Sequence, residues 1–237
     1  MANFTLIEAE GLGQIVRKSQ VILSSQIWTA PLRLAGNTIR VTGCAGGGSG
    51  MCQGDSTSTV NAVGGSGGTY VESFPLIVTP GSSYTVTIPA GGLGSTSTGN
   101  DGGDLTFGTL LTLKGGKGGS FIGNALNTLV TTANSARGIT PPLIVFATNT
   151  QVFIPGQSVN GNIPGNTSQS QTTGTVGGGA AGYFGNGTNG LYANAVNVGT
   201  SAGANTGAGS GAVVGQAGST SGAGGSGRLI IEWDELV

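Results

Sequence analysis

TIRVTGCAGGGSG, at residues 38–50, joins the two kinds of segment from which the whole chain is built. Thr38–Thr42 is a short β-branched run of the kind found in strands, and Gly43–Gly50 is a glycine-rich run. In Ser83–Ile88 apolar and polar residues alternate with period two, as in a strand with one buried face. No segment carries a helical apolar period, so the sequence predicts an all-β fold with short antiparallel strands. The other expected strands are Ser19–Ser24, Tyr70–Val78, Leu105–Leu113, Leu143–Phe146, Gln151–Ile154 and Arg228–Trp233.

Glycine supplies 49 of the 237 residues, about three times its average share. Ordering so much glycine is costly in entropy, and few side chains are present to bond its backbone amides and carbonyls. We therefore expect the glycine-rich segments to pack side by side in a polyglycine-II-like arrangement. Irregular glycine spacing in Gly199–Gly227 excludes collagen, which needs glycine at every third position. A flexible linker is the alternative, although a net charge of −1 leaves little repulsion to keep the chain open.

Composition divides the chain into two parts. Residues 1–20 precede the glycine-rich pattern, and we interpret them as an N-terminal attachment segment. Residues 21–237 are expected to form one glycine-rich β domain with an insertion at about 121–175. The insertion holds four of the eight prolines and a stretch rich in Asn, Gln, Ser and Thr.

Residue types argue against an enzyme. Histidine is absent, which removes the most common general base and metal ligand, so we expect no catalytic residue, no metal site and no cofactor. Carboxylate pairs suited to glycoside hydrolysis occur, but we expect Asp101 to lie in a turn and the acids near the chain ends to be solvated. These pairs are Asp101 with Asp104, Glu8 with Glu10, and Glu232 with Asp234 or Glu235.

Other motifs have plain explanations. Gly185–Gly190 and Gly222–Gly227 match G-x-G-x-x-G by letter, but neither opens a helix, as dinucleotide binding requires. Cys44 and Cys52 are expected to be small buried thiols, with a disulfide as the alternative. The 8 Lys and Arg residues form no basic stripe and no apolar run is long enough to span a bilayer. We therefore expect neither nucleic-acid binding nor membrane insertion.

Four pieces of the chain form an ordered pattern: Ile27–Pro31 leading into Ile39–Gly43, Gly67–Glu72 with Val78–Ile88, Gly102–Leu111 with Gly115–Gly119, and Gly224–Trp233. In this order they resemble the glycine-rich domain of tail-fibre and tail-tip proteins of tailed bacteriophages. Similarity covers about residues 22–120 and 176–233, and the chain departs from the pattern in its insertion and its sparse glycine runs.

That resemblance implies a virion protein of the phage tail, assembled in the host cytoplasm and acting in host recognition and adsorption. Its partners would be other phage tail proteins and a bacterial surface receptor, either a polysaccharide or an outer-membrane protein. We expect the protein to form a homo-oligomer, with a trimer as the expected form. A purely architectural virion component without receptor contact, such as a tail cap or decoration, is the alternative. An antifreeze-like polyglycine bundle is a third class of function. It would need flat, regular rows of small residues, and the interruptions in this sequence disfavour it.

Aromatic residues make up only 5% of the chain, yet three of them fall within one short segment. Aromatic faces beside amide side chains suit recognition of sugars or protein surfaces. The alternative is that the rings fill gaps between glycine-rich layers. Trp28 and Trp233 are expected to be core anchors. The candidate receptor-binding residues are Tyr183, Phe184, Asn186, Asn189 and Tyr192.

Overall fold

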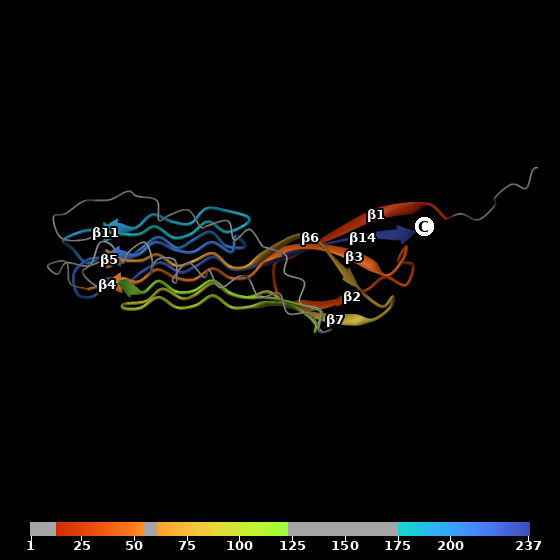
Figure 1. Cartoon of the computed structure of the whole chain (residues 1–237), viewed down its shortest axis with the longest axis horizontal. Coiled ribbons are helices and arrows are strands. Elements are labelled where there is room, and N and C mark those ends of the chain that lie inside the picture. The colour runs from red at the N-terminus through yellow and green to blue at the C-terminus, as the bar shows by residue number, and fades with distance from the viewer. Residues whose placement is uncertain (1–12, 55–60, 123–174) are drawn as a thin grey trace, which may run out of the picture.

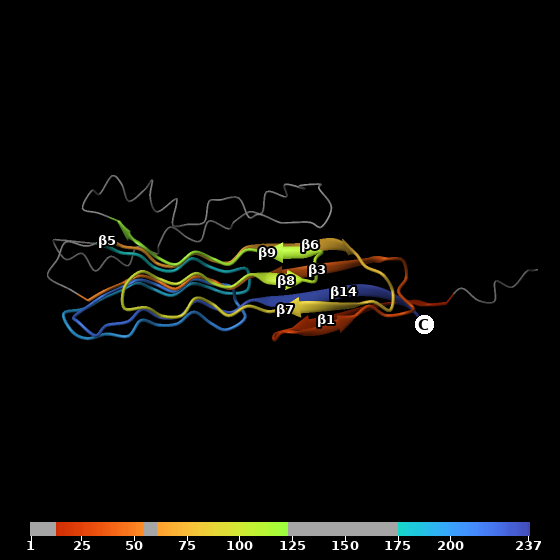
Figure 2. The same cartoon turned by 90° about the horizontal axis from the view of Figure 1, so that it is seen from below.

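The computed structural model describes residues 13–54, 61–122 and 175–237, which form an elongated body (Figure 1). Broad strands make up one half, and narrow undulating segments lie side by side in the other half (Figures 1 and 2). No helix occurs among the described residues, and the prediction of an all-β fold is confirmed. The strands are β1 (Ile15–Ile22), β2 (Gln26–Thr29), β3 (Thr38–Cys44), β4 (Cys52–Gln53), β5 (Asn61–Ala62), β6 (Tyr70–Ile77), β7 (Ser83–Thr87), β8 (Leu105–Phe107), β9 (Leu111–Leu113), β10 (Phe121–Ile122), β11 (Thr175–Val176), β12 (Leu191–Tyr192), β13 (Val213–Val214) and β14 (Arg228–Leu236).

Two four-stranded antiparallel sheets form a β-sandwich at one end of the molecule. Their strand orders are β1-β14-β3-β6 and β2-β7-β8-β9. Side chains alternate across each strand, so Ile39 and Val41 of β3 are fully buried while Arg40 between them is exposed. Buried residues of both sheets belong to one hydrophobic cluster. Each large aliphatic side chain buried in this way stabilises the fold by about 1.5–3 kcal/mol.

The two tryptophans meet at this core: Trp28 is buried in it, as expected of a core anchor, and Trp233 is half-buried and packs against it. Trp28 of β2 is 4% exposed, and its ring centroid lies 5.7 Å from that of Phe107. Trp233 of β14 lies edge-on to Trp28 at 5.9 Å. Residues near opposite ends of the sequence therefore close the same core.

The expected single strand Leu105–Leu113 is wrong, because the chain reverses within it. β8 and β9 form a hairpin in which Leu105 lies opposite Leu113. Gly108 has a φ of +50°, and the Leu110 amide donates to the Phe107 carbonyl at 2.9 Å. Glycine accepts this left-handed conformation without steric cost, which makes the tight turn possible.

The turn at Pro80–Gly81 is present, but the pairing expected across it is wrong. Gly81 has a φ of +77°, and the Ser82 amide donates to the Thr79 carbonyl at 3.0 Å, as in a type II turn. β6 before the turn pairs with β3, whereas β7 after it pairs with β2 and β8. The turn therefore carries the chain from one sheet of the sandwich to the other.

Strand boundaries at the N-terminus also differ from the prediction. β1 covers Ile15–Ile22 and pairs along its whole length with β14, so part of the segment assigned to attachment lies in the sheet. β2 was not among the expected strands. The expected strands Leu143–Phe146 and Gln151–Ile154 lie outside the described residues. At the edges of the insertion, β10 and β11 both pair with β5.

Away from the sandwich, the glycine-rich segments form a bundle around a central segment, residues 45–52. Successive amides of this segment point to different neighbours, and the direction repeats every third residue, except that the Gly50 amide donates to Ser210 Oγ. This is the three-residue turn of the polyglycine-II helix, with hydrogen bonds that run between helices. Seven of these bonds are 2.7–3.1 Å long: Ala45, Gly48 and Met51 donate to Thr69, Ser66 and Val63; Gly46, Ser49 and Cys52 donate to Gly103, Asn100 and Ser97; Gly47 donates to Gly225.

Carbonyls of the central segment accept from three further segments. Gly46 and Ser49 accept from Gly116 and Gly119, respectively, and Gly47 accepts from Gly92. Gly48 and Met51 accept from Ser210 and Val213, respectively. Six neighbours thus surround residues 45–52, and each is bonded to the next. The backbone hydrogen bonds that close this ring run, from donor to acceptor, from Ser66 to Lys117, Gly102 to Gly116, Gly103 to Ala90, Gly224 to Gly92, Gly225 to Ala208, and Gly65 to Ser210. The glycine-rich run is therefore packed, as expected for a polyglycine-II arrangement.

Close packing of this kind depends on glycine at the contact positions. A Cβ added at Gly47 would lie 2.1 Å from the Ala208 carbonyl oxygen. One added at Gly54, near the far end of the bundle, would lie 3.5 Å from the nearest atom, the Ala217 Cα, which is an ordinary contact. Glycine is required where backbone meets backbone and is replaceable elsewhere.

We predict that Gly47→Ala destabilises the protein by about 3 kcal/mol or more, because the methyl group forces two hydrogen-bonded segments apart. Gly54→Ala serves as the control and should change the free energy of unfolding by less than about 0.5 kcal/mol. Urea denaturation of both variants measures the difference. Equal stability of the two variants would contradict the packed bundle.

Candidate functional site

Tyr183 and Phe184 lie at the junction between sandwich and bundle, where they pack against residues at the starts of two strands. The Tyr183 ring stacks on Tyr70 of β6 with centroids 4.8 Å apart. Phe184 meets Tyr183 edge-on at 4.7 Å, and the Arg228 guanidinium of β14 lies 3.5 Å above the Phe184 ring. These contacts agree with the alternative interpretation, in which the rings fill gaps between glycine-rich layers, and they include a cation–π contact.

Both tyrosines of the cluster have a raised pKa, chiefly because of burial. Burial, with a hydrogen bond from the phenol to Glu72, raises the pKa of Tyr183. Burial and the charge of Glu72 also raise the pKa of Tyr70. Arg228 Nε is buried without a hydrogen-bond partner and faces an aromatic environment. The cluster therefore ties β6 and β14 to the bundle.

The chain from Tyr183 to Tyr192 runs along the outside of the bundle. Thr188 and Leu191 amides donate to Gly209 and Ala212, while the Thr188 carbonyl accepts from Gly179. A Cβ added at Gly187 would lie 2.1 Å from the Gly179 carbonyl oxygen, so this residue faces inward. Asn186 and Asn189 are exposed. With three residues per turn they share one face, about 9 Å apart along the axis.

Tyr192 lies at the far end of the bundle, away from the sandwich. It belongs to β12, which pairs with β13, and β13 pairs with β4 (Figure 1 labels β4 at this end). Its ring packs on a second, smaller hydrophobic cluster that includes Met51 and Val214. Its hydroxyl donates to Asn194 Oδ1 at 3.3 Å.

The structure does not gather the five candidates into one site. Tyr183 and Phe184 are packed at one end of the segment and Tyr192 at the other, with Asn186 and Asn189 displayed between them. Asn186 and Asn189 are three residues apart, and the three-residue period seen in the structure shows that this spacing places them on one face. Strand pairing brings Tyr70 and Arg228 to the cluster, and no signal in the sequence marked these two residues.

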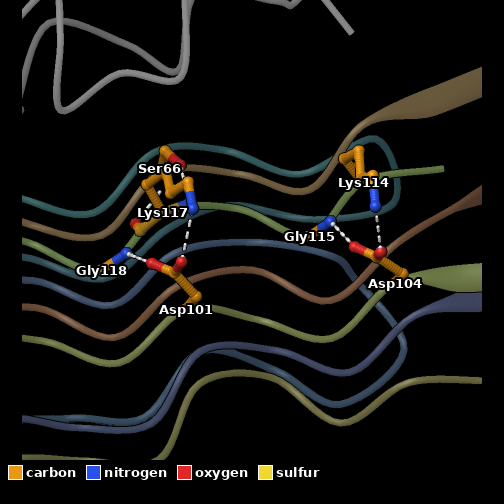
Figure 3. Close-up of polar contacts among 7 residues, drawn as sticks. All are labelled: Ser66, Asp101, Asp104, Lys114, Gly115, Lys117 and Gly118. Atoms are coloured by element: carbon orange, nitrogen blue, oxygen red, sulfur yellow. Dashed lines mark hydrogen bonds and ion pairs between the residues drawn. The ribbon is translucent and has the colours of Figure 1, made fainter. Parts of the chain in front are cut away.

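Asp101 and Asp104 form a ladder with two lysines, so the expectation that Asp101 lies in a turn is wrong. Lys117 Nζ lies 2.6 Å from Asp101 Oδ2, and Lys114 Nζ lies 2.6 Å from Asp104 Oδ2 (Figure 3). The other oxygen of each carboxylate accepts a backbone amide, from Gly118 at 2.8 Å and Gly115 at 2.9 Å. Both acids lie on one glycine-rich segment and both lysines on its neighbour, three residues apart in each.

Both carboxylates are held in the charged form. Burial alone would raise the pKa of Asp101, but hydrogen bonds from Lys117 and the Gly118 amide outweigh it and lower the pKa. The same balance lowers the pKa of Asp104, with Lys114 and Gly115 as donors. Their ion pairs with the lysines join two neighbouring segments of the bundle.

Carboxylates of β14 are also engaged in the sheet. Asp234 accepts from Arg17 of β1 at 3.0 Å, and Glu235 accepts from the Trp233 indole at 3.4 Å. The acids near this end of the chain therefore lie in a strand, and Asp234 is ion-paired where we expected only solvation. Glu8 and Glu10 lie outside the described residues.

Neither G-x-G-x-x-G match adjoins a helix. Gly185–Gly190 lies in the outer segment of the bundle, and Gly222–Gly227 runs into β14. Without the helix N-terminus that binds a pyrophosphate, these glycines are packing positions.

Cys44 and Cys52 are both buried free thiols, as expected, and they form no disulfide. Burial raises the pKa of Cys44 to about 11. Among the described residues no group of three or more Cys, Asp or Glu side chains could hold a metal ion. The same residues contain no helix long and apolar enough to cross a membrane.

The carboxylate ladder predicts a pH-dependent contribution to stability. Both folded-state pKa values lie below the usual aspartate value of about 3.9, so the stabilisation is present above that value and is lost as pH falls through the folded pKa. Asp101→Asn/Asp104→Asn should lower the free energy of unfolding at pH 7, by about 1 kcal/mol given the exposure of the pairs. The deficit should shrink at about pH 2.5 in urea denaturation. A deficit of equal size at both pH values would show that the charges are not its source.

Comparison with known families gives a match over most of the chain. A family model described as a glycine-rich domain matches residues 22–234, from the end of β1 to near the end of β14. No curated protein is significantly similar to the chain. Because the match spans both the sandwich and the described bundle, the chain belongs to this glycine-rich domain family.

Proposed function

We propose that the chain is a structural protein of a bacteriophage tail tip or tail fibre that contributes to host recognition and adsorption. One observation carries the proposal: a bundle joined through its backbone extends from a sandwich that holds both ends of the described chain (Figure 1). Other tail proteins would bind near the sandwich, and a bacterial polysaccharide or outer-membrane protein would meet the bundle.

The bundle suits display because its fold depends little on its outward side chains. Asn186 and Asn189 are exposed, uncharged donors and acceptors on a rigid backbone, so binding would order few groups. Turns near Asn194 and Gln216 add exposed polar residues at the far end, where the Gln216 amide donates to the Ala195 carbonyl at 3.0 Å. These groups form the candidate contact surface.

A purely architectural role is the second candidate. The packing of Tyr183 and Phe184 against Tyr70 and Arg228 favours it, since two of the five proposed contact residues are engaged within the molecule. The two candidates differ in whether the exposed amides matter for adsorption.

We expect Asn186→Ala/Asn189→Ala to slow phage adsorption about tenfold or more while leaving the fold intact, because both side chains are exposed. Thr85→Ala/Thr87→Ala, which changes two exposed residues of β7, is the matched control and should adsorb normally. The measurement is the adsorption rate of particles carrying each variant to host cells. Normal adsorption of particles with the Asn186 and Asn189 changes would favour the architectural role.

Removal of residues 1–12 tests attachment. This deletion spares β1, which begins at Ile15, so the sandwich should fold with normal thermal stability. We expect the shortened protein to be missing from tails in immunogold electron microscopy, while the full chain labels the tail end. Labelling of tails by the shortened protein would refute an attachment role for these residues, and full-length label away from the tail would refute the proposed function.

A further inference from the structure

β1 differs from the other edge strands of the sandwich. β6 is interrupted by Pro75 and by a positive φ of 46° at Ser73, where the pairing with β3 shifts. β2 and β9 are short, with 4 and 3 residues. Proline, bulges and short length are the usual means of blocking further pairing at a sheet edge. β1 has 8 residues, no proline or glycine, and no shift in its register with β14.

Backbone groups of β1 alternate between β14 and the open side. The Val237 amide donates to the Gln14 carbonyl at 2.9 Å, one step before the ladder. Because hydrogen-bonded pairs in an antiparallel ladder occur at every second residue, the even-numbered residues of β1 bond to β14. Amides and carbonyls of Ile15, Arg17, Ser19 and Val21 therefore face away from the sheet.

Apolar side chains accompany these groups. Ile15, Val21 and the following Leu23 are 61%, 54% and 51% exposed. Together with the backbone groups that face the open side, these exposed side chains make the β1 edge suited to pairing with another strand.

We infer that two copies of the chain pair in solution through β1, antiparallel, about a two-fold axis at Ser19. In a continuous sheet the two-fold axis is perpendicular to the sheet. Residues that lie opposite each other then point to the same face, and their numbers are both odd or both even. Centring on Ser19 satisfies this condition. It joins the two four-stranded sheets into one continuous sheet.

Side chains favour this register. Val16 lies opposite Ile22 of the second copy, and Ile15 lies opposite Leu23 of the second copy, which covers two of the exposed apolar residues. Lys18 lies opposite Gln20 of the second copy. Moving the axis to Lys18 would place two lysines directly opposite each other, which is destabilising. The like charges therefore disfavour the Lys18-centred register relative to the Ser19-centred one.

A pair formed in this way is closed, because each copy uses its one β1 edge. It conflicts with the homotrimer considered from the sequence. The inference concerns the isolated protein and does not rest on the proposed function, so each can fail without the other.

Sedimentation or light scattering of the full chain should give twice the 23.0 kDa of one copy. Ser19→Pro removes an amide that faces the open side and spares the bonds to β14, so it should give a folded monomer with an unchanged circular dichroism spectrum. Ser19→Ala keeps the amide and should remain a dimer. A monomeric or trimeric wild-type chain, or dimeric Ser19→Pro, would overturn the inference.

A disulfide tests the register. Residues 18 and 20 of the two copies would form a non-hydrogen-bonded pair with Cα atoms about 4.5 Å apart, within reach of a disulfide. Lys18→Cys/Gln20→Cys should form a covalent dimer on oxidation, visible on a non-reducing gel. Lys18→Cys alone should not, and neither should the wild type, whose Cys44 and Cys52 are buried. Cross-linking by Lys18→Cys alone would support the Lys18-centred register and contradict ours.

Discussion

Hydrogen bonds between backbones that approach without side chains are the constraint on which the bundle depends. The central segment bonds to six neighbours, and a Cβ at Gly47 or Gly48 would lie 2.1 Å from a carbonyl oxygen. A hydrophobic core cannot form where backbones approach so closely, so the bundle has only small apolar clusters such as that of Met51 and Val214. Stability comes from many bonds that each contribute about 1 kcal/mol, and a buried amide left unpaired costs more than that.

The sandwich supplies the register that glycine cannot. Neighbours of β3 in the sheet remain its neighbours in the bundle: Cys44 lies opposite Tyr70 and Arg228, and farther along Ala45 bonds to Thr69 and Gly47 to Gly225. Polyglycine segments can slide along one another because they lack distinguishing side chains. Pairing in the sandwich, where buried Ile39 and Leu229 permit only one alignment, fixes the start of each segment. The ladder of Asp101 and Asp104 with two lysines fixes another pair of segments by charge.

Most strands of the sandwich could be predicted from the sequence, because β-branched residues alternate in Thr38–Thr42 and Ser83–Ile88. β2 was missed and the bounds of β1 differ from the prediction, and two further features could not be predicted either. Gly108 is one glycine among many, so its left-handed turn within Leu105–Leu113 gives no distinct signal. Partners across the Pro80–Gly81 turn depend on which sheet each strand joins, and that is decided by the shared core around Trp28. The candidate site was only partly predictable: Asn186 and Asn189 were named as candidates and are exposed, but contacts with Tyr70 and Arg228 arise from pairing distant in sequence.

The three-residue period also determines where this fold can vary. In an ordinary β-sheet every second side chain is buried, so half of each strand is constrained by the core. In the outer segment of the bundle, Gly187 faces a neighbouring backbone while Asn186 and Asn189 face outward. The outward Asn186 and Asn189 side chains contribute little to the hydrogen-bond network, because that network joins backbone groups to one another or to other side chains such as Ser49 and Ser210. A change at Asn186 can therefore alter a binding surface without altering the fold, whereas a change at Gly187 cannot occur without moving a segment. Selection for a new contact would act on the first kind of position and leave the glycines in place.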